Sequence, residues 1–386
     1  MRLQSSGSAA TRRRPRSAMR RAAPSSTATI WCCCDPPLQG EGDHPEGGGG
    51  ARAAKCGVRP PAPLPHASHG APPRTGEERL MTHRTLAMTG ATGFVGGATL
   101  HRAVEAGWHV RALTRRPQGE REGVTWIAGA LDKPDSLADM VAGADVVMHI
   151  AGVVNVPTRA AFEAGNATAT ANVIAAARDA HISRFVHVSS LAAREPGLSD
   201  YGWSKERAEA VVQASGLDWT IVRPPAVFGP GDTEMLDLFR MVRRGVALLP
   251  PPGRMSAIYV DDLARLLVVL AADKGTSFGR IYEPDDGTPG GWSHRGFARA
   301  IGRAVGRAHV PTLAAPALLL KVGGRIDRFI RRDRAKLTPD RARYIVHPDW
   351  VVADGARPPA TIWRPERETD EALAETARWY RREGWL

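Results

Sequence analysis

A tyrosine and a lysine lie four residues apart, at Tyr201 and Lys205, in a stretch that is typical of the start of a helix. That spacing places both side chains on one helical face. A nearby ammonium stabilises the phenolate and lowers the pKa of a tyrosine from its ordinary value of about 10, so the tyrosine can exchange a proton with a substrate oxygen. We therefore predict an acid/base pair, in which the lysine can also hold a ribose.

A serine at the end of a predicted strand is the third member of this set. Ser190 lies two residues after the predicted strand Arg184–Val188. Ligands bind at the carboxyl ends of strands in open α/β sheets, so Ser190 is predicted to hydrogen-bond the reacting oxygen beside Tyr201. The plainer interpretation is a serine that caps a helix. We prefer the catalytic interpretation because three features converge on one sheet edge.

Glycines with a spacing of three lie between a predicted strand and a predicted helix. Gly90 permits a tight turn, Gly93 lets a pyrophosphate approach the backbone, and Gly96 lets the helix pack on the strand. The N–H groups at the start of the helix then face the anion. The loop residues predicted to bind this dinucleotide are Gly90, Thr92, Gly93, Phe94, Val95 and Gly96.

The end of the second predicted strand indicates which dinucleotide binds. An acidic side chain there would accept hydrogen bonds from the ribose of NAD, but the sequence has Arg115 and Arg116 instead. Two arginines can pair with a 2′-phosphate, which favours NADP(H) over NAD(H). The alternative is a solvated basic turn.

Short apolar runs alternate with helical stretches after Met81, and this order predicts a parallel sheet with crossover helices. The expected fold is α/β, a Rossmann-type doubly wound sheet at 81–274 with a smaller C-terminal substrate lobe at 275–386. Strands are expected at Thr85–Thr89, His109–Thr114, Val124–Ile127, Asp145–Ile150, Arg184–Val188 and Trp219–Val222, and helices at Phe94–Ala106 and Ala169–Asp179.

The first eighty residues differ in composition from the rest of the chain. Residues 1–80 are rich in Arg, Ala, Gly, Pro and Ser and show no sustained hydrophobic period, so we expect them to be disordered. An Arg- and Ser-rich start without acids is typical of a transit peptide. A mis-assigned start, with translation beginning at Met81, is the interpretation we prefer.

Composition excludes several classes of protein. The formal net charge of +12 is divided equally between residues 1–80 and the other 306 residues, which argues against an extended nucleic-acid surface in the folded part. All four cysteines precede residue 57, without the paired spacing of a zinc site, so no metal is expected. No apolar run is long enough to span a membrane. We expect a soluble cytoplasmic protein that binds a small molecule and can form a homodimer.

With these motifs assembled, the chain resembles the extended and atypical branches of the short-chain dehydrogenase/reductase family, including the NAD(P)-dependent epimerase/dehydratase group. The resemblance covers T-G-A-T-G-F-V-G, H-I-A-G, the serine-tyrosine-lysine set, R-P-P-A-V-F-G-P-G-D and Y-V-D-D-L-A. It implies that Asp132 binds the adenine, that Ala151 and Gly152 line the cofactor, and that Pro224 and Val227 flank the nicotinamide. It also implies that Asn166 supports the catalytic lysine through water.

One departure bears on the substrate. Only ten residues, 191–200, separate Ser190 from Tyr201, whereas sugar-nucleotide epimerases usually carry a longer insertion. The short loop makes the chain similar to atypical members, some of which resemble the NADPH-holding accessory subunit of respiratory complex I. Two functions are therefore open: an NAD(P)-dependent oxidoreductase or epimerase with NADP favoured, or a non-catalytic NADPH-binding assembly protein.

The C-terminal lobe is expected to close over the substrate. Its stretch Leu313–Arg334 has an apolar start and a basic end. Such a stretch could lie on a membrane surface. We prefer a lid helix packed on the sheet.

Overall fold

The computed structural model describes residues 84–316, 318 and 338–386. The predicted disordered extension at 1–80 lies outside the described residues. Most of the stretch Leu313–Arg334, namely residue 317 and residues 319–334, also lies outside them.

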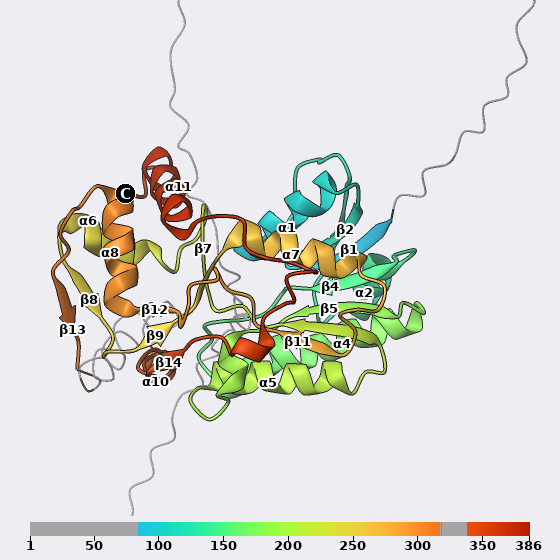
Figure 1. Cartoon of the computed structure of the whole chain (residues 1–386). Coiled ribbons are helices and arrows are strands. Elements are labelled where there is room, and N and C mark those ends of the chain that lie inside the picture. The colour runs from blue at the N-terminus through green and yellow to red at the C-terminus, as the bar shows by residue number, and fades with distance from the viewer. Residues whose placement is uncertain (1–83, 317, 319–337) are drawn as a thin grey trace, which may run out of the picture. The chain divides into compact units, whose positions relative to one another are not determined.

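Seven parallel strands form the central sheet, in the order β11-β6-β5-β4-β1-β2-β3 (Figure 1). The strands are β1 (Thr85–Thr89), β2 (His109–Thr114), β3 (Val124–Ala128), β4 (Val146–His149), β5 (Arg184–Val188), β6 (Asp218–Val222) and β11 (Arg280–Tyr282). The order reverses between β1 and β4, which is the switch point of a doubly wound sheet. The predicted Rossmann-type fold is confirmed, and the six predicted strands match within two residues at each end.

Both faces of the sheet are covered by helices because successive side chains of a strand point to opposite faces. Leu86 and Met88 pack with helices α1 (Phe94–Glu105) and α7 (Val260–Ala272). Ala87, between them in the sequence, belongs to the core on the other face. That face is covered by α2 (Pro134–Val141), α4 (Ala169–Asp179) and α5 (Asp200–Gln213).

A second core lies in the smaller lobe, around Phe239, Phe297 and Tyr380. These side chains belong to α6 (Leu236–Arg244), α8 (His294–Val305) and α11 (Thr369–Arg382). Residues on both sides of Lys274 contribute to this core. The predicted domain boundaries stay a prediction.

Short strands connect these helices, and we did not predict them. A parallel pair is formed by β7 (Ala226–Phe228) and β10 (Ala257–Tyr259), and another by β8 (Ala247–Leu249) and β13 (Thr312–Ala314). A three-stranded sheet contains β9 (Arg254–Met255), β12 (Trp292–Ser293) and β14 (Asp349–Trp350). The remaining described elements are α3 (Arg159–Phe162), η1 (Glu163–Thr168), η2 (Leu191–Arg194), α10 (Pro339–Ile345) and η4 (Asp354–Ala356).

Within the described part of the chain, no helix is both long and apolar enough to cross a membrane.

Candidate active site

Two positions of the glycine loop, Gly90 and Gly96, have no room for a side chain. Gly90 has a φ of 76°, and a Cβ there would lie 2.7 Å from the backbone nitrogen of Ala151. A Cβ on Gly96 would collide with the carbonyl oxygen of Gly90. The loop ends at Gly93, whose N–H donates to the Gly90 carbonyl at 3.0 Å, and α1 begins at Phe94. Thr92 is exposed and Val95 half-buried. This backbone fits a pyrophosphate at a helix N-terminus.

The two arginines lie beside this loop, because β2 pairs with β1 and both strands end at the same edge. Arg115 and Arg116 are exposed. The hydroxyl of Thr114 donates to the Arg116 carbonyl at 2.7 Å and accepts from its N–H at 3.3 Å, which holds the turn. Asp132 is also exposed and follows β3 at this edge.

Tyr201 and Lys205 lie in the first two turns of α5, as predicted from their spacing. Ser199 caps the helix by accepting from the N–H of Gly202 at 2.9 Å. Lys205 is buried, and its ammonium donates to the carbonyl of Val188 at 2.9 Å. Burial lowers the pKa of Lys205 to about 8. Lys205 is therefore locked against the end of β5.

Asn166 and Lys205 both lie close to Gly152. A Cβ on Gly152 would lie 2.8 Å from Oδ1 of Asn166 and 3.6 Å from Nζ of Lys205. The amide of Asn166 accepts from the N–H of Val153 at 2.8 Å and donates to the hydroxyl of Ser204 at 2.8 Å. Asn166 lies in the π-helical turn η1, a distortion that is frequent at functional sites.

Ser190 follows β5 and caps the short helix η2. Its hydroxyl oxygen accepts from the N–H of Ala192 at 3.2 Å, which is the plainer interpretation considered from the sequence. Among the described residues its hydroxyl proton has no acceptor. Pro224 is buried nearby, since its carbonyl accepts from the N–H of Leu191 at 3.0 Å. Val227 is half-buried in β7. A catalytic role for Ser190 stays a prediction.

A buried histidine that we did not single out connects the glycine loop to Asn166. The hydroxyl of Thr170 donates to the Asn166 carbonyl at 2.7 Å, so it must accept from Nε2 of His149 at 3.1 Å. Nδ1 of His149 then accepts from the hydroxyl of Thr89 at 2.7 Å. Burial, with the charge of Lys205, lowers the pKa of His149 to about 3, so the ring is neutral. The H-I-A-G motif contained this residue, but its role depends on partners distant in sequence.

Aromatic side chains surround Tyr201. Phe162 lies 6.1 Å and Tyr344 6.5 Å from its ring, centroid to centroid. Trp350 packs 4.7 Å from Tyr344 and donates its indole N–H to the Tyr344 carbonyl at 3.0 Å. Tyr344 and Trp350 come from the C-terminal lobe, and no local sequence pattern indicates that they reach Tyr201. The tyrosine therefore faces an apolar, aromatic surface.

A buried charge network lies behind this site. Arg223 binds both oxygens of Glu209, at 2.9 and 2.6 Å, and one oxygen of Glu283 at 3.3 Å. The hydroxyl of Ser189 donates to Glu209 at 2.5 Å. Both carboxylates keep at most 3% of their side-chain exposure. The network fixes α5 against the ends of β5, β6 and β11.

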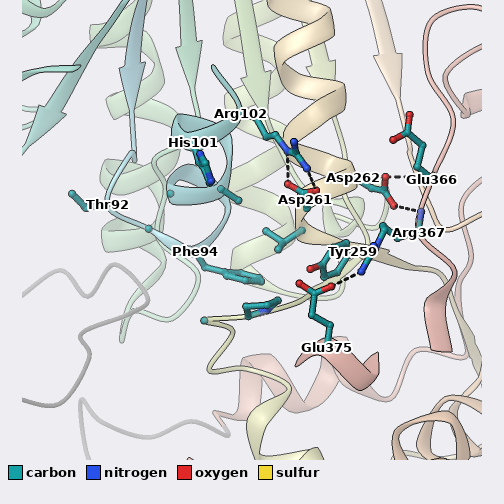
Figure 2. A pocket seen from close by; sticks show the side chains of 16 residues that line it. Thr92, Phe94, His101, Arg102, Tyr259, Asp261, Asp262, Glu366, Arg367 and Glu375 are labelled. Atoms are coloured by element: carbon teal, nitrogen blue, oxygen red, sulfur yellow. Dashed lines mark hydrogen bonds and ion pairs between the residues drawn. The ribbon is translucent and has the colours of Figure 1, made fainter. Parts of the chain in front are cut away.

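A cavity of about 740 Å³ borders the glycine loop and the first turns of α1 (Figure 2). Thr92, Phe94 and His101 line it from the loop and α1. Two ion pairs, Arg102 with Asp261 and Arg367 with Glu375, also line the cavity. Neither Tyr201 nor Lys205 lines this cavity. The cavity is therefore separate from the Tyr201 and Lys205 pair.

Comparison with known proteins agrees with this geometry. Residues 90–274 match the family described as NAD(P)H-binding. The ceramide reductase of Caulobacter vibrioides is 33% identical over 310 residues, which are 78% of this chain and 96% of the relative. The 4-hydroxy-2-methyl-3-oxo-4-farnesyl-3,4-dihydroquinoline-1-oxide ketoreductase of Stigmatella aurantiaca is 31% identical over 66% of this chain and 89% of the relative.

Solved structures share the fold at lower identity. MoeE5 in complex with UDP-glucose and NAD is 21% identical, with a TM-score of 0.59 over 78% of this chain and 99% of that protein. At this identity the likeness supports the fold and not the substrate.

Proposed function

The chain belongs to the extended short-chain dehydrogenase/reductase family of NAD(P)-dependent oxidoreductases and epimerases, and we propose that it is an NADPH-dependent ketoreductase that acts on a ketone carried by a long apolar chain. The observation that carries the proposal is a buried lysine in α5, four residues after Tyr201, whose ammonium donates to the carbonyl of Val188 at the end of β5. Localisation in the cytoplasm and a homodimer stay predictions within it.

In this proposal the phenol of Tyr201 donates its proton to the ketone oxygen while the carbonyl carbon is reduced. The ammonium of Lys205 stabilises the phenolate that remains, and Ser190 hydrogen-bonds the same oxygen. The carbonyl of Val188 holds the ammonium of Lys205, and in this proposal Asn166 supports the lysine through water. When bound, the reduced nicotinamide supplies the hydride.

Two features support an apolar substrate. The aromatic side chains of Phe162, Tyr344 and Trp350 around Tyr201 suit contact with an alkyl ketone. Two relatives are named for reduction of lipid-like compounds, a ceramide and a farnesylated quinoline.

The preference for NADPH is tested by fluorescence titration with NADPH and NADH. We expect wild type to bind NADPH more tightly, and Arg115→Ala with Arg116→Ala to weaken NADPH binding about tenfold while leaving NADH unchanged, because the arginines would pair with the 2′-phosphate alone. Arg121→Ala, an exposed arginine nearby, is the matched control. Equal loss for both cofactors would contradict the assignment.

The substrate class is tested by NADPH consumption with 3-oxo esters of increasing alkyl length and with UDP-glucose. We expect kcat/KM to rise with chain length and no turnover of the sugar nucleotide. Turnover of the sugar alone would contradict the proposal. NADPH binding without any turnover would favour the assembly-protein alternative.

A further inference from the structure

Exposed apolar side chains gather on one small sheet of the C-terminal lobe. Among the described residues six large apolar side chains are exposed; three of them lie on or directly beside β8 and β13, and a fourth follows β13 by four residues. These are Val246, Leu248, Leu313 and Leu318, with 40%, 51%, 60% and 70% of their surface exposed. We call them the apolar strip. Leu248 and Leu313 are register partners, so they lie side by side on the outer face of this sheet.

Arginines border the apolar strip. Arg243 and Arg244 end α6, two to five residues before Val246 and Leu248, and both are exposed. The guanidinium of Arg307 donates to the carbonyl of Arg243 at 3.1 and 2.9 Å, so it lies at the same place. Within the described ranges none of the three forms an ion pair with an acid. Elsewhere on this lobe, Arg303 is paired with Asp370 at 2.7 Å.

We propose that the apolar strip and its three arginines dock the protein on an anionic membrane surface. Apolar side chains that enter the lipid boundary, bordered by cations that contact anionic headgroups, are the two components of interfacial binding. The unpaired positive charge favours anionic lipid over a second copy of this chain, which would bring the same charges together.

The inference deepens the proposed function, on which it rests for the substrate: a ketone on a long apolar chain is delivered from a bilayer. Leu318 precedes residues that the structure does not describe, and α10 (Pro339–Ile345) carries Tyr344, whose ring lies 6.5 Å from that of Tyr201. Figure 1 shows β8 and β13 next to α6 and α8, in the same lobe that supplies α10 and β14.

The test is sedimentation of the full chain with vesicles of phosphatidylcholine alone and of phosphatidylcholine with phosphatidylglycerol. We expect binding only to the anionic vesicles, and loss of that binding at high salt. Leu248→Ser with Leu313→Ser should weaken it about tenfold or more. Arg243→Ala with Arg244→Ala should do the same, because each cation near an anionic surface contributes about fivefold. The matched control is Val269→Ser with Arg178→Ala, both exposed on other helices.

Three results would overturn the proposal. The first is no binding to anionic vesicles. The second is binding that survives both double substitutions, which would assign it to another basic segment such as residues 1–80. The third is a dimer in solution that Leu248→Ser with Leu313→Ser disperses, without vesicle binding, which would make the strip an interface between copies. Turnover of a short soluble ketone by the double variants separates these results from a failure of the proposed reaction, because it should stay unchanged.

Discussion

At the scale of single residues, we expect Lys205 to set the pH range in which the proposed reaction runs. Its side chain is buried, and burial favours the neutral amine, so its pKa falls from an ordinary 10.5 to about 8. The ammonium is therefore half titrated near pH 8 and predominates only below that pH. Because the pKa is lower in the folded state, deprotonation of Lys205 adds stability as the pH rises from about 8 to about 10.5.

We expect kcat for reduction to fall as the pH rises through about 8, while this residue contributes no loss of stability over the same range. The reason is that the neutral amine no longer stabilises the phenolate of Tyr201. The measurement is kcat at saturating substrate between about pH 6 and pH 10, with thermal unfolding recorded at each pH. A flat profile, or a fall in rate that follows a fall in unfolding temperature, would count against this role.

The sequence was informative about residues whose type and spacing are local. Tyr201 and Lys205 were placed correctly on one helix, and the glycine loop lies at the strand-to-helix turn expected for it. It was uninformative about His149, because the role of this histidine depends on hydrogen bonds to Thr89 and Thr170, which are distant in sequence.

At the scale of elements, α1 must approach the glycine loop closely to present its N-terminus. Gly96 and Gly97 are neighbours in that helix, but their surroundings differ. A Cβ on Gly96 would collide with the carbonyl of Gly90, whereas one on Gly97 would have the Ala91 carbonyl oxygen at 3.8 Å, an ordinary contact.

We therefore expect Gly96→Ala to abolish measurable NADPH binding and to destabilise the fold by about 1–3 kcal/mol, as overpacking does. Gly97→Ala should retain the fold and at least its wild-type stability, because alanine favours a helix. The measurements are NADPH titration and urea unfolding of both variants. Equal NADPH affinity in the two would show that the close approach does not matter.

The longest elements were predicted well, and the shortest were not, for a physical reason. Strands of five residues such as β1 (TLAMT) and β5 (RFVHV) contain three apolar residues each and are long enough to stand out in the sequence. Strands of two or three residues, such as β9 and β14, are too short to show a period and form only when the lobe closes around them.

At the scale of the molecule, the charge network at Arg223 joins the central sheet to the C-terminal chain. Glu283 accepts from Arg223 and also from the N–H of Ala353 at 3.0 Å. The guanidinium of Arg194 donates to the Val351 carbonyl at 2.7 Å. These contacts hold the chain that carries Trp350 beside Tyr201, and no local pattern in the sequence could have predicted them.

We expect Arg223→Met to reduce the free energy of unfolding by about 3–5 kcal/mol, because it leaves Glu209 buried without its cation and leaves Glu283 with Arg194 alone, at 3.7 Å. The control is Arg303→Ala, which breaks the exposed pair with Asp370 and should cost about 1 kcal/mol or less. Urea unfolding of both variants measures the difference. Similar small losses in the two would mean that water reaches the network.

The central claim is that Tyr201 is the proton donor in an NADPH-dependent reduction. Its most direct test is a single-turnover measurement of NADPH oxidation by wild type and Tyr201→Phe, with NADPH affinity measured on the same samples. We predict that the phenylalanine variant binds NADPH within about twofold of wild type and reduces the ketone at least about 100-fold more slowly. A variant that binds NADPH and reduces the ketone at the wild-type rate would contradict the account.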